Sequence, residues 1–280
     1  MRTADRLDAG LAARWLATFD LTQDDTPIMP QGIHFALCSP QAPTALLGED
    51  GHPALNRGAG SFLPPFPQFA AAPRRMWASS RMTFHAPVTV GATIGRTSRI
   101  ASISEKDGSS GPLAFVEVEH ETSVDGELAV HDVQTLVYRD AAPADAPLSP
   151  PALGDESFDP SGWDAHREVK PDPRLLFRYS ALTFNTHRIH YDEPYTREVE
   201  RYRGLVVHGP LTASLLLQLA AQRYGENALA SFAFRGVSPA IAGETLHLVL
   251  RDGEDGVEMG AFAADGRRVT KASASLQPSG

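Results

Sequence analysis

The chain has 280 residues, of which 42% are hydrophobic and 21% charged, as in an ordinary soluble globular protein. This length allows one large domain or two of about 140 residues. The formal net charge of −9 argues against a nucleic-acid-binding surface. The single cysteine, Cys38, excludes an internal disulfide framework. Residues 1–20 lack the apolar core of a signal peptide, and the apolar run at 211–221 is too short to span a bilayer. We therefore expect a cytoplasmic protein without a membrane partner.

The first seventy residues predict one helix and then an ordered loop. An apolar residue recurs every fourth position within residues 5–19, which predicts an amphipathic helix. These residues are Leu7, Leu11, Trp15 and Phe19. Residues 31–73 are rich in proline and glycine, so no long helix can form there. The aromatic residues of this segment indicate a loop that packs on a core.

Two segments, residues 81–139 and 231–276, predict antiparallel strands. Each has stretches in which apolar and polar residues alternate, and each contains an Asp-Gly turn, at Asp125-Gly126 and at Asp265-Gly266. The Pro/Ala/Asp-rich residues that lie between them indicate a linker. We therefore predict a first unit over residues 1–145, a linker over 146–160 and a second unit over 161–280.

The two units resemble each other. Residues 84–93 can be aligned with residues 234–245 if two residues are inserted, and the two Asp-Gly turns then occupy matched places. The second unit has a long apolar helix before its strands, whereas the first has the Pro-rich loop at 61–73. The prediction is an α+β fold in which two antiparallel sheets each wrap around a central helix, with the N-terminal helix reduced or lost.

Residues 211–221 contain no charged residue and are apolar on nearly every face, which is typical of a buried helix. Pro210 suits the first helical position and Gly209 can act as the N-cap. The free N–H groups of a buried helix start would face the loop before it. That loop carries an asparagine, acidic residues and three histidines, His187, His190 and His208. We expect the chemistry of the protein there.

Residues 184–192 (Phe-Asn-Thr-His-Arg-Ile-His-Tyr-Asp) and 204–211 (Gly-Leu-Val-Val-His-Gly-Pro-Leu) resemble the hydratase motif of MaoC-like, double-hot-dog enoyl-thioester hydratases and dehydratases. Within that family they are most similar to the group of hydroxyacyl-thioester dehydratase type 2 and the mesaconyl-C4-CoA and itaconyl-CoA hydratases. Residues 73–78 and 84–87 extend the resemblance over most of the chain. The commoner motif is Ser-Gly-Asp-x-Asn-Pro-Ile-His. Asn185 stands at its aspartate, whereas His190 keeps its histidine.

The resemblance implies the reversible hydration of a 2-enoyl thioester to a 3-hydroxyacyl thioester. It also implies an acyl-CoA substrate, no separate cofactor and a homodimer. The reaction needs a base for water, a proton for the α-carbon and a partner for the enolate oxygen. His190 can take and return a proton near neutral pH. Asn185 can hold the water through its amide, and the N–H of Gly209 can bind the oxyanion.

Further residues are predicted to bind substrate. A distal carboxylate in a dry pocket would require a cation, for which the candidates are Arg74, Arg75 and Arg188. We expect the acyl chain to lie between the two halves, in the space of the missing first helix, against Phe66 and Trp77. His208 is a candidate substrate contact, although a structural role within the loop is the stronger interpretation.

Other interpretations of the loop remain open. His190 and Asn185 could be satisfied polar residues in a buried loop. A metal could bind to some of five side chains, although their spacing is no established signature. These are His187, His190, Asp192, Glu193 and His208. The alternative functions are a 3-hydroxyacyl-ACP dehydratase, a hot-dog thioesterase and a non-catalytic acyl-binding protein.

Overall fold

The computed structural model describes residues 1–22, 26–54, 74–108 and 111–278. Its strands form a single antiparallel sheet in the order β1-β3-β4-β5-β2-β7-β10-β9-β8-β6. The strands of the N-terminal half are β1 (Arg2–Arg6), β2 (Arg74–Phe84), β3 (Thr93–Gly108), β4 (Gly111–Val124) and β5 (Glu127–Arg139). Those of the C-terminal half are β6 (Ala165–Val169), β7 (Leu229–Gly236), β8 (Leu246–Gly253), β9 (Gly256–Ala263) and β10 (Arg268–Leu276).

The strand order repeats within the sheet. In each half, from the outer edge to the centre, the strands run first, third, fourth, fifth and second in chain order. The halves meet where β2 pairs with β7, with Ser80 opposite Phe234. The two predicted sheets are therefore joined edge to edge into one, and the repeated order supports an internal duplication. The predicted boundaries at 145, 146–160 and 161 stay a prediction, because the strand order does not fix where one unit ends.

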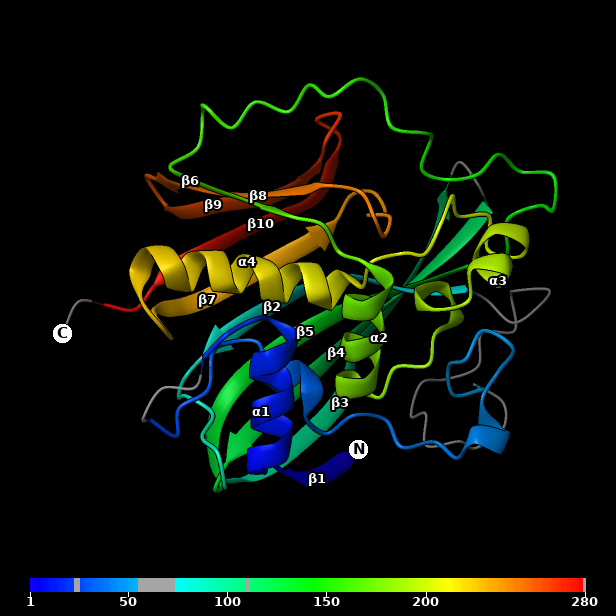
Figure 1. Ribbon diagram of the computed structural model, residues 1–280. Helices are drawn as coiled ribbons and strands as arrows, with labels where there is room; N and C mark the ends of the chain where they lie inside the picture. The colour runs from blue at the N-terminus through cyan, green and yellow to red at the C-terminus, as the bar shows by residue number, and fades with distance from the viewer. Residues whose placement is uncertain (23–25, 55–73, 109–110, 279–280) are drawn as a thin grey trace.

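The helices lie against this sheet (Figure 1). They are α1 (Ala9–Thr18), α2 (Pro173–Thr183), α3 (Glu193–Glu198) and α4 (Gly209–Tyr224), with short 3-10 turns η1 (Ile33–Ala36), η2 (Thr44–Leu46) and η3 (Arg188–His190). The predicted helix over residues 5–19 is too long. Asp8 accepts a hydrogen bond from the backbone N–H of Leu11 and caps α1, while the residues before it pair with β3 as the edge strand β1. None of the helices in the described ranges is long and apolar enough to cross a membrane.

The helix α4 runs along the inner side of the C-terminal strands (Figure 1). Every residue from 211 to 220 is buried, as predicted. The helix begins one residue earlier than expected, with His208 as its N-cap. Gly209 can take the helical conformation before a proline because it has no Cβ to clash with the ring. Gly209 itself is exposed, so the predicted burial of the helix start is wrong: the body of α4 is buried and its first residue is open.

The N-terminal half contains no counterpart of α4 within the described residues, where residues 37–54 hold only η2. The segment 61–73, for which we predict a reduced helix, lies outside the described residues, as does Phe66. The core is nevertheless continuous between the halves. Trp15 of α1 and Tyr179 of α2 contact across it, with ring centroids 6.3 Å apart. This packing fixes α2, and with it the loop that follows α2.

Candidate active site

The catalytic loop, residues 184–192, begins where α2 ends. Phe184 caps α2 in the left-handed conformation, with a φ of 50°. A bulky residue rarely adopts that conformation, and such strain is often found at functional sites. The side-chain oxygen of Asn185 then accepts a hydrogen bond from the backbone N–H of His187 at 2.9 Å. This turn leads the chain into η3, where Ile189 and His190 are buried.

His190 is held in one orientation by a backbone carbonyl. Its Nδ1 lies 2.7 Å from the carbonyl oxygen of Val206. A carbonyl can only accept, so Nδ1 carries the hydrogen and Nε2 keeps the lone pair. Burial lowers the pKa of His190 to about 4, although the hydrogen bond to Val206 opposes this effect. The imidazole is therefore neutral at pH 7 and can accept a proton at Nε2.

Two further imidazoles flank His190. His208 stacks on it, with ring centroids 3.5 Å apart and an angle of 18° between the planes. His187 meets it edge to face at 5.5 Å and 88°. The Nε2 atom of His208 lies 2.9 Å from the hydroxyl oxygen of Ser180 on α2. Burial, with the charge of His190 second, holds the pKa of His208 well below its usual range. His208 is buried behind His190, which fits a structural role better than a substrate contact.

A segment of the N-terminal half, residues 48–53, docks on the catalytic loop, and we call it the strap. The hydroxyl of Thr186 donates to the carbonyl oxygen of Gly51 at 2.6 Å. The backbone N–H of Arg188 donates to the carbonyl oxygen of Asp50 at 2.9 Å. Gly51 has a φ of 88°, and a Cβ there would overlap the carbonyl oxygen of Thr186. Only glycine fits such a close approach.

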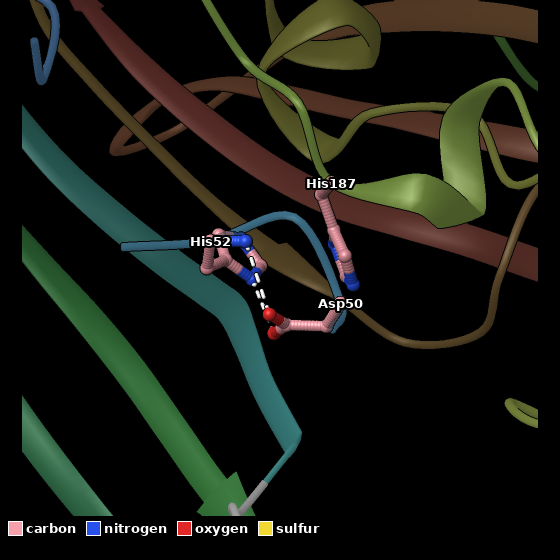
Figure 2. Close-up of side chains that lie close together, drawn as sticks. All are labelled: Asp50, His52 and His187. Carbon is pink, nitrogen blue, oxygen red and sulfur yellow. Dashed lines mark hydrogen bonds and ion pairs between the residues drawn. The ribbon is translucent and has the colours of Figure 1, made fainter. Parts of the chain in front are cut away.

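The strap brings Asp50 and His52 to His187 (Figure 2). The Nδ1 atom of His52 lies 2.8 Å from a carboxylate oxygen of Asp50, and the two imidazole centroids of His52 and His187 lie 4.1 Å apart. Burial is the largest cause and raises the pKa of Asp50, but the two hydrogen bonds and the charge of His52, together with the charge of Arg75, outweigh it and hold that pKa below its usual value. Burial, followed by the charge of Arg75, lowers the pKa of His52 to about 4. The pair is therefore a carboxylate and a neutral imidazole that donates to it.

The strand β2 passes beside the start of α4. A Cβ at Gly209 would lie 3.8 Å from the carbonyl oxygen of Trp77. The half-buried indole of Trp77 lies between Phe35 and Phe234, with ring centroids 5.7 Å and 6.3 Å away. The charge of Arg75, two residues earlier, lowers the pKa of His187, after burial and the charges of His52 and His190. The open helix start, which follows His208, and the charge of Arg75 thus border the histidines.

The three arginines predicted to bind substrate have different surroundings in the structure. Arg74 is buried, and its Nε lies 2.9 Å from the carboxylate of Glu200. Arg188 forms a salt bridge with Asp192 at 2.7 Å and lies over the ring of Tyr195 at 3.9 Å. Both guanidinium groups are thus held by protein contacts, and their role in binding substrate stays a prediction. Arg75 is the candidate that borders the histidines.

The five side chains considered as metal ligands do not form one group in the described part of the chain. Asp192 binds Arg188, and Glu193 is exposed. His187 instead groups with Asp50 and His52, whose potential ligand atoms lie within 4.8 Å of one another. The hydrogen bond between His52 and Asp50 already occupies one potential ligand atom of each residue. The positive charge of Arg75 nearby disfavours the binding of a metal cation. The group fits a metal poorly.

Sequence reasoning missed Asp50 and His52, because they lie far from the motif in the Pro/Gly-rich segment. One signal was present: Asp50-Gly51-His52-Pro53 places an acid and a histidine around a glycine in a tight turn. That pattern predicts a local hydrogen bond between the two side chains. It does not reveal which part of the chain the turn contacts.

Comparisons with known proteins identify the family and the fold. The model of the family described as hydroxyacyl-thioester dehydratase type 2 matches residues 32–242. A mesaconyl-C(4)-CoA hydratase from Chloroflexus aurantiacus is 40% identical over 255 residues, covering 90% of this chain and 85% of the relative. The crystal structure of HtdX from Mycobacterium tuberculosis aligns with a TM-score of 0.69 at 18% identity, covering 99% of each chain.

The fold is also found in a second protein from Mycobacterium tuberculosis, which is described as having a double hotdog fold. It aligns with a TM-score of 0.58 at 16% identity and covers 97% of this chain and 92% of its own. Because identity is low, this likeness concerns the fold alone. The predicted α+β double-hot-dog fold is confirmed.

Proposed function

The chain belongs to the hydroxyacyl-thioester dehydratase type 2 family, and from this membership we propose that it catalyses the reversible hydration of a 2-enoyl-CoA to a 3-hydroxyacyl-CoA at His190. The observation that carries the proposal is the fixed tautomer of His190. Its Nδ1–H is committed to the carbonyl of Val206, which leaves the Nε2 lone pair for water. The family resemblance and the open start of α4 beside this histidine support the same reaction.

Each reacting group has a partner in this arrangement. Nε2 of His190 takes a proton from water as the oxygen bonds to the β-carbon, and the electron pair of the C=C bond moves to the thioester oxygen. The N–H of Gly209, at the positive end of α4, binds that oxyanion. The amide of Asn185 holds the water. The proton then passes from His190 to the α-carbon, which restores the neutral imidazole and requires no cofactor.

We further propose that the substrate carries a carboxylate next to the reacting bond. The Chloroflexus relative is named for mesaconyl-C4-CoA. Mesaconic acid is methylfumaric acid, so the β-carbon of its C4 thioester bears the methyl group and the free carboxylate. A carboxylate at that carbon lies beside the catalytic base and needs a cation there. Arg75, whose charge lowers the pKa of both His52 and His187, is the candidate cation.

A substrate panel tests both statements. Mesaconyl-C4-CoA, itaconyl-CoA and crotonyl-CoA are incubated with the protein while enoyl-thioester absorbance and free thiol are recorded. We expect absorbance to fall without thiol release, and kcat/KM to be highest for a substrate with the carboxylate. Thiol release would identify a thioesterase, and binding without turnover would identify an acyl-binding protein. Higher kcat/KM for crotonyl-CoA would contradict the dicarboxylic substrate.

The proposal includes CoA rather than acyl carrier protein as the carrier, and a homodimer in the cytoplasm. The C4-CoA relative supports CoA as the carrier, whereas the homodimer rests on the resemblance to the family. Comparing acyl-CoA with acyl carrier protein thioesters in the same assay tests the carrier. Light scattering on a sizing column tests the dimer, which a monomer mass would contradict.

A further inference from the structure

The outer face of the C-terminal half carries two histidines and a glutamate on neighbouring strands, which we call the β6–β8 cluster. His166 and Glu168 lie two residues apart on the edge strand β6, and His247 on β8 lies directly opposite Glu168. Successive side chains of a strand point to opposite faces, so these three share one face. Arg167, between the two residues of β6, points to the other face and donates to the carbonyl oxygen of Leu215 on α4 at 3.0 Å.

The potential ligand atoms of the β6–β8 cluster face one another. Nε2 of His166 lies 3.0 Å from Nδ1 of His247, and that Nδ1 lies 3.8 Å from a carboxylate oxygen of Glu168. All three atoms lie within 4.8 Å of one another. Two imidazole nitrogens on one tetrahedral zinc ion are about 3.3 Å apart, since each Zn–N distance is about 2.0 Å. Small movements of the side chains therefore suffice to form a zinc site.

The ring of His247 is held with Nδ1 toward the cluster. The side chain is buried, and its Nε2 has no hydrogen-bond partner among the described residues. Phe158 stacks on this ring, with centroids 4.5 Å apart and an angle of 24° between the planes. The same phenyl ring lies 5.9 Å from the ring of His166. Nδ1 is thus the atom of His247 that can bind a ligand in the cluster.

Phe158 is fixed by the turn between β9 and β10. The backbone N–H groups of Ser157 and Phe158 both donate to the carbonyl oxygen of Ala264, at 3.0 and 3.1 Å. The hydroxyl of Ser157 donates to the carbonyl oxygen of Asp265 at 2.8 Å. In Figure 1, the green segment that leads to β6 runs over the outer side of the C-terminal strands. The cluster is therefore covered by Phe158 and open at Glu168, which is exposed.

The charges around His247 suit a cation. Burial is the largest cause that lowers the pKa of His247, so its imidazole is neutral at pH 7 and keeps a lone pair. The carboxylates of Glu168 and Glu156 oppose this effect, whereas the ring of His166 adds to it. Two negative charges therefore act on the ring that carries the buried ligand atom.

The group of Asp50, His52 and His187 provides a comparison, because its ligand atoms have a similar spacing. There the positive charge of Arg75 lowers the pKa of both histidines. The carboxylate of Asp50 already accepts a hydrogen bond from His52 at 2.8 Å. The β6–β8 cluster is therefore the better cation site of the two.

We propose that His166, Glu168 and His247 bind a zinc ion that fastens the edge strand β6 to β8. Glu156 strengthens this binding through its charge. Imidazole nitrogen and carboxylate oxygen are ligands that Zn²⁺ accepts. The ion stabilises the folded chain, because only folding brings these groups together. It also stabilises the strand whose Arg167 holds α4. This role is structural and goes beyond the proposed hydration.

Zinc titration of the untagged protein tests the site. The protein is freed of metal with a chelator and titrated with Zn²⁺ in a calorimeter, and its melting temperature is measured with and without zinc. We expect one zinc ion to bind per chain. The melting temperature should rise by roughly 5 °C at a zinc concentration of about a hundred times the Kd.

Conservative variants of the two ligands on β6 locate the ion. His166→Gln and Glu168→Gln should each weaken zinc binding by at least about tenfold and remove most of the rise in melting temperature. His131→Gln is the matched control. His131 also contacts a carboxylate, that of Glu119 at 2.7 Å, but this carboxylate also binds Arg99. We expect zinc binding by this variant to match the wild type.

Asp50→Asn distinguishes the two groups with similar spacing, and we expect it to keep the zinc ion. Three results would overturn the inference. They are a wild type that shows neither heat of binding nor a shift in melting temperature, equal zinc binding by the wild type and both β6 variants, and zinc lost in Asp50→Asn but kept in His166→Gln. Circular dichroism checks folding, and if one β6 variant does not fold, the other provides the test. The readouts do not include hydration, so failure here is distinct from failure of the proposed function.

Discussion

The two halves of the molecule share a strand order but differ in what lies inside the sheet. In the C-terminal half, α4 lies along the strands, and Leu248, Leu250 and Met259 join the core beside it. In the N-terminal half, the inner face carries buried polar side chains, including Ser80, Thr122 and Asp132. Burial raises the pKa of Asp132 to about 7. The duplication therefore preserved the sheet, while the described parts of the two interiors diverged.

The same contrast appears in two 3-10 turns. Each half follows its first helix with an Ile-His pair on such a turn, Ile33-His34 on η1 and Ile189-His190 on η3. Both histidines are buried and have lowered pKa values, about 3 for His34 and about 4 for His190. Only His190, within the described residues, has a helix start, a fixing carbonyl and a row of imidazoles around it. These neighbours are what distinguish His190, the proposed base, from the buried neutral His34.

The largest effect is expected when His190 is replaced by alanine, and the same replacement at His34 provides the comparison. His190→Ala should lower kcat/KM by about 10²–10⁴-fold, because the proton carrier is lost, while the fold remains intact. His34→Ala should lower the melting temperature by leaving a cavity, yet the folded variant should keep its activity. Hydration assays and thermal melts of both variants check this. Equal activity losses would mean that neither histidine is special.

Asn185 tests the other part of the catalytic loop. Asn185→Ala should lower kcat by about 10²–10³-fold, the range for removing a positioned polar group. The substitution also removes the hydrogen bond that the Asn185 side chain accepts from the backbone N–H of His187. Steady-state kinetics on the best substrate provide the measurement. Unchanged kcat would remove Asn185 from the mechanism.

Adjacent arginines on β2 should respond differently. Arg75→Met should raise KM for mesaconyl-C4-CoA by roughly 10²-fold and change KM for crotonyl-CoA far less, since only the first substrate presents a carboxylate. Arg74→Met should leave that ratio unchanged and lower stability, because it breaks a buried ion pair with Glu200. KM values and melting temperatures separate the two effects. Equal losses on both substrates for Arg75→Met would assign this residue to CoA phosphate or to solvent.

The sequence indicated much of the fold because its signals are local. The apolar run of α4 and the Asp-Gly turns depend on side chains close in the chain, so these predictions hold. The edge strand β1 was missed because residues 2–6 become a strand only by pairing with β3. The strap was missed for the same reason: the contact between Gly51 and Thr186 joins segments that are far apart in the sequence. Long-range pairing, which local patterns do not encode, accounts for both errors.

The smallest effect concerns pH and stability. The buried His34 and His190 and the half-buried His52 and His120 have pKa values of about 3 to 4 in the folded protein, against 6.5 when exposed. The unfolded chain therefore binds more protons between pH 6.5 and 4, and stability falls as pH falls through this window. Melting temperatures between pH 7 and 5 check this, and a flat profile would contradict it.

The most direct test of the account is product analysis in water labelled with heavy oxygen. Mesaconyl-C4-CoA is incubated with the wild type and with His190→Ala, and the thioester products are examined by mass spectrometry. We predict that the wild type adds one labelled oxygen at the β-carbon, leaves the thioester intact and forms far more product than the variant. Equal labelled product from the variant, or label only in a free acid released from CoA, would contradict hydration at His190.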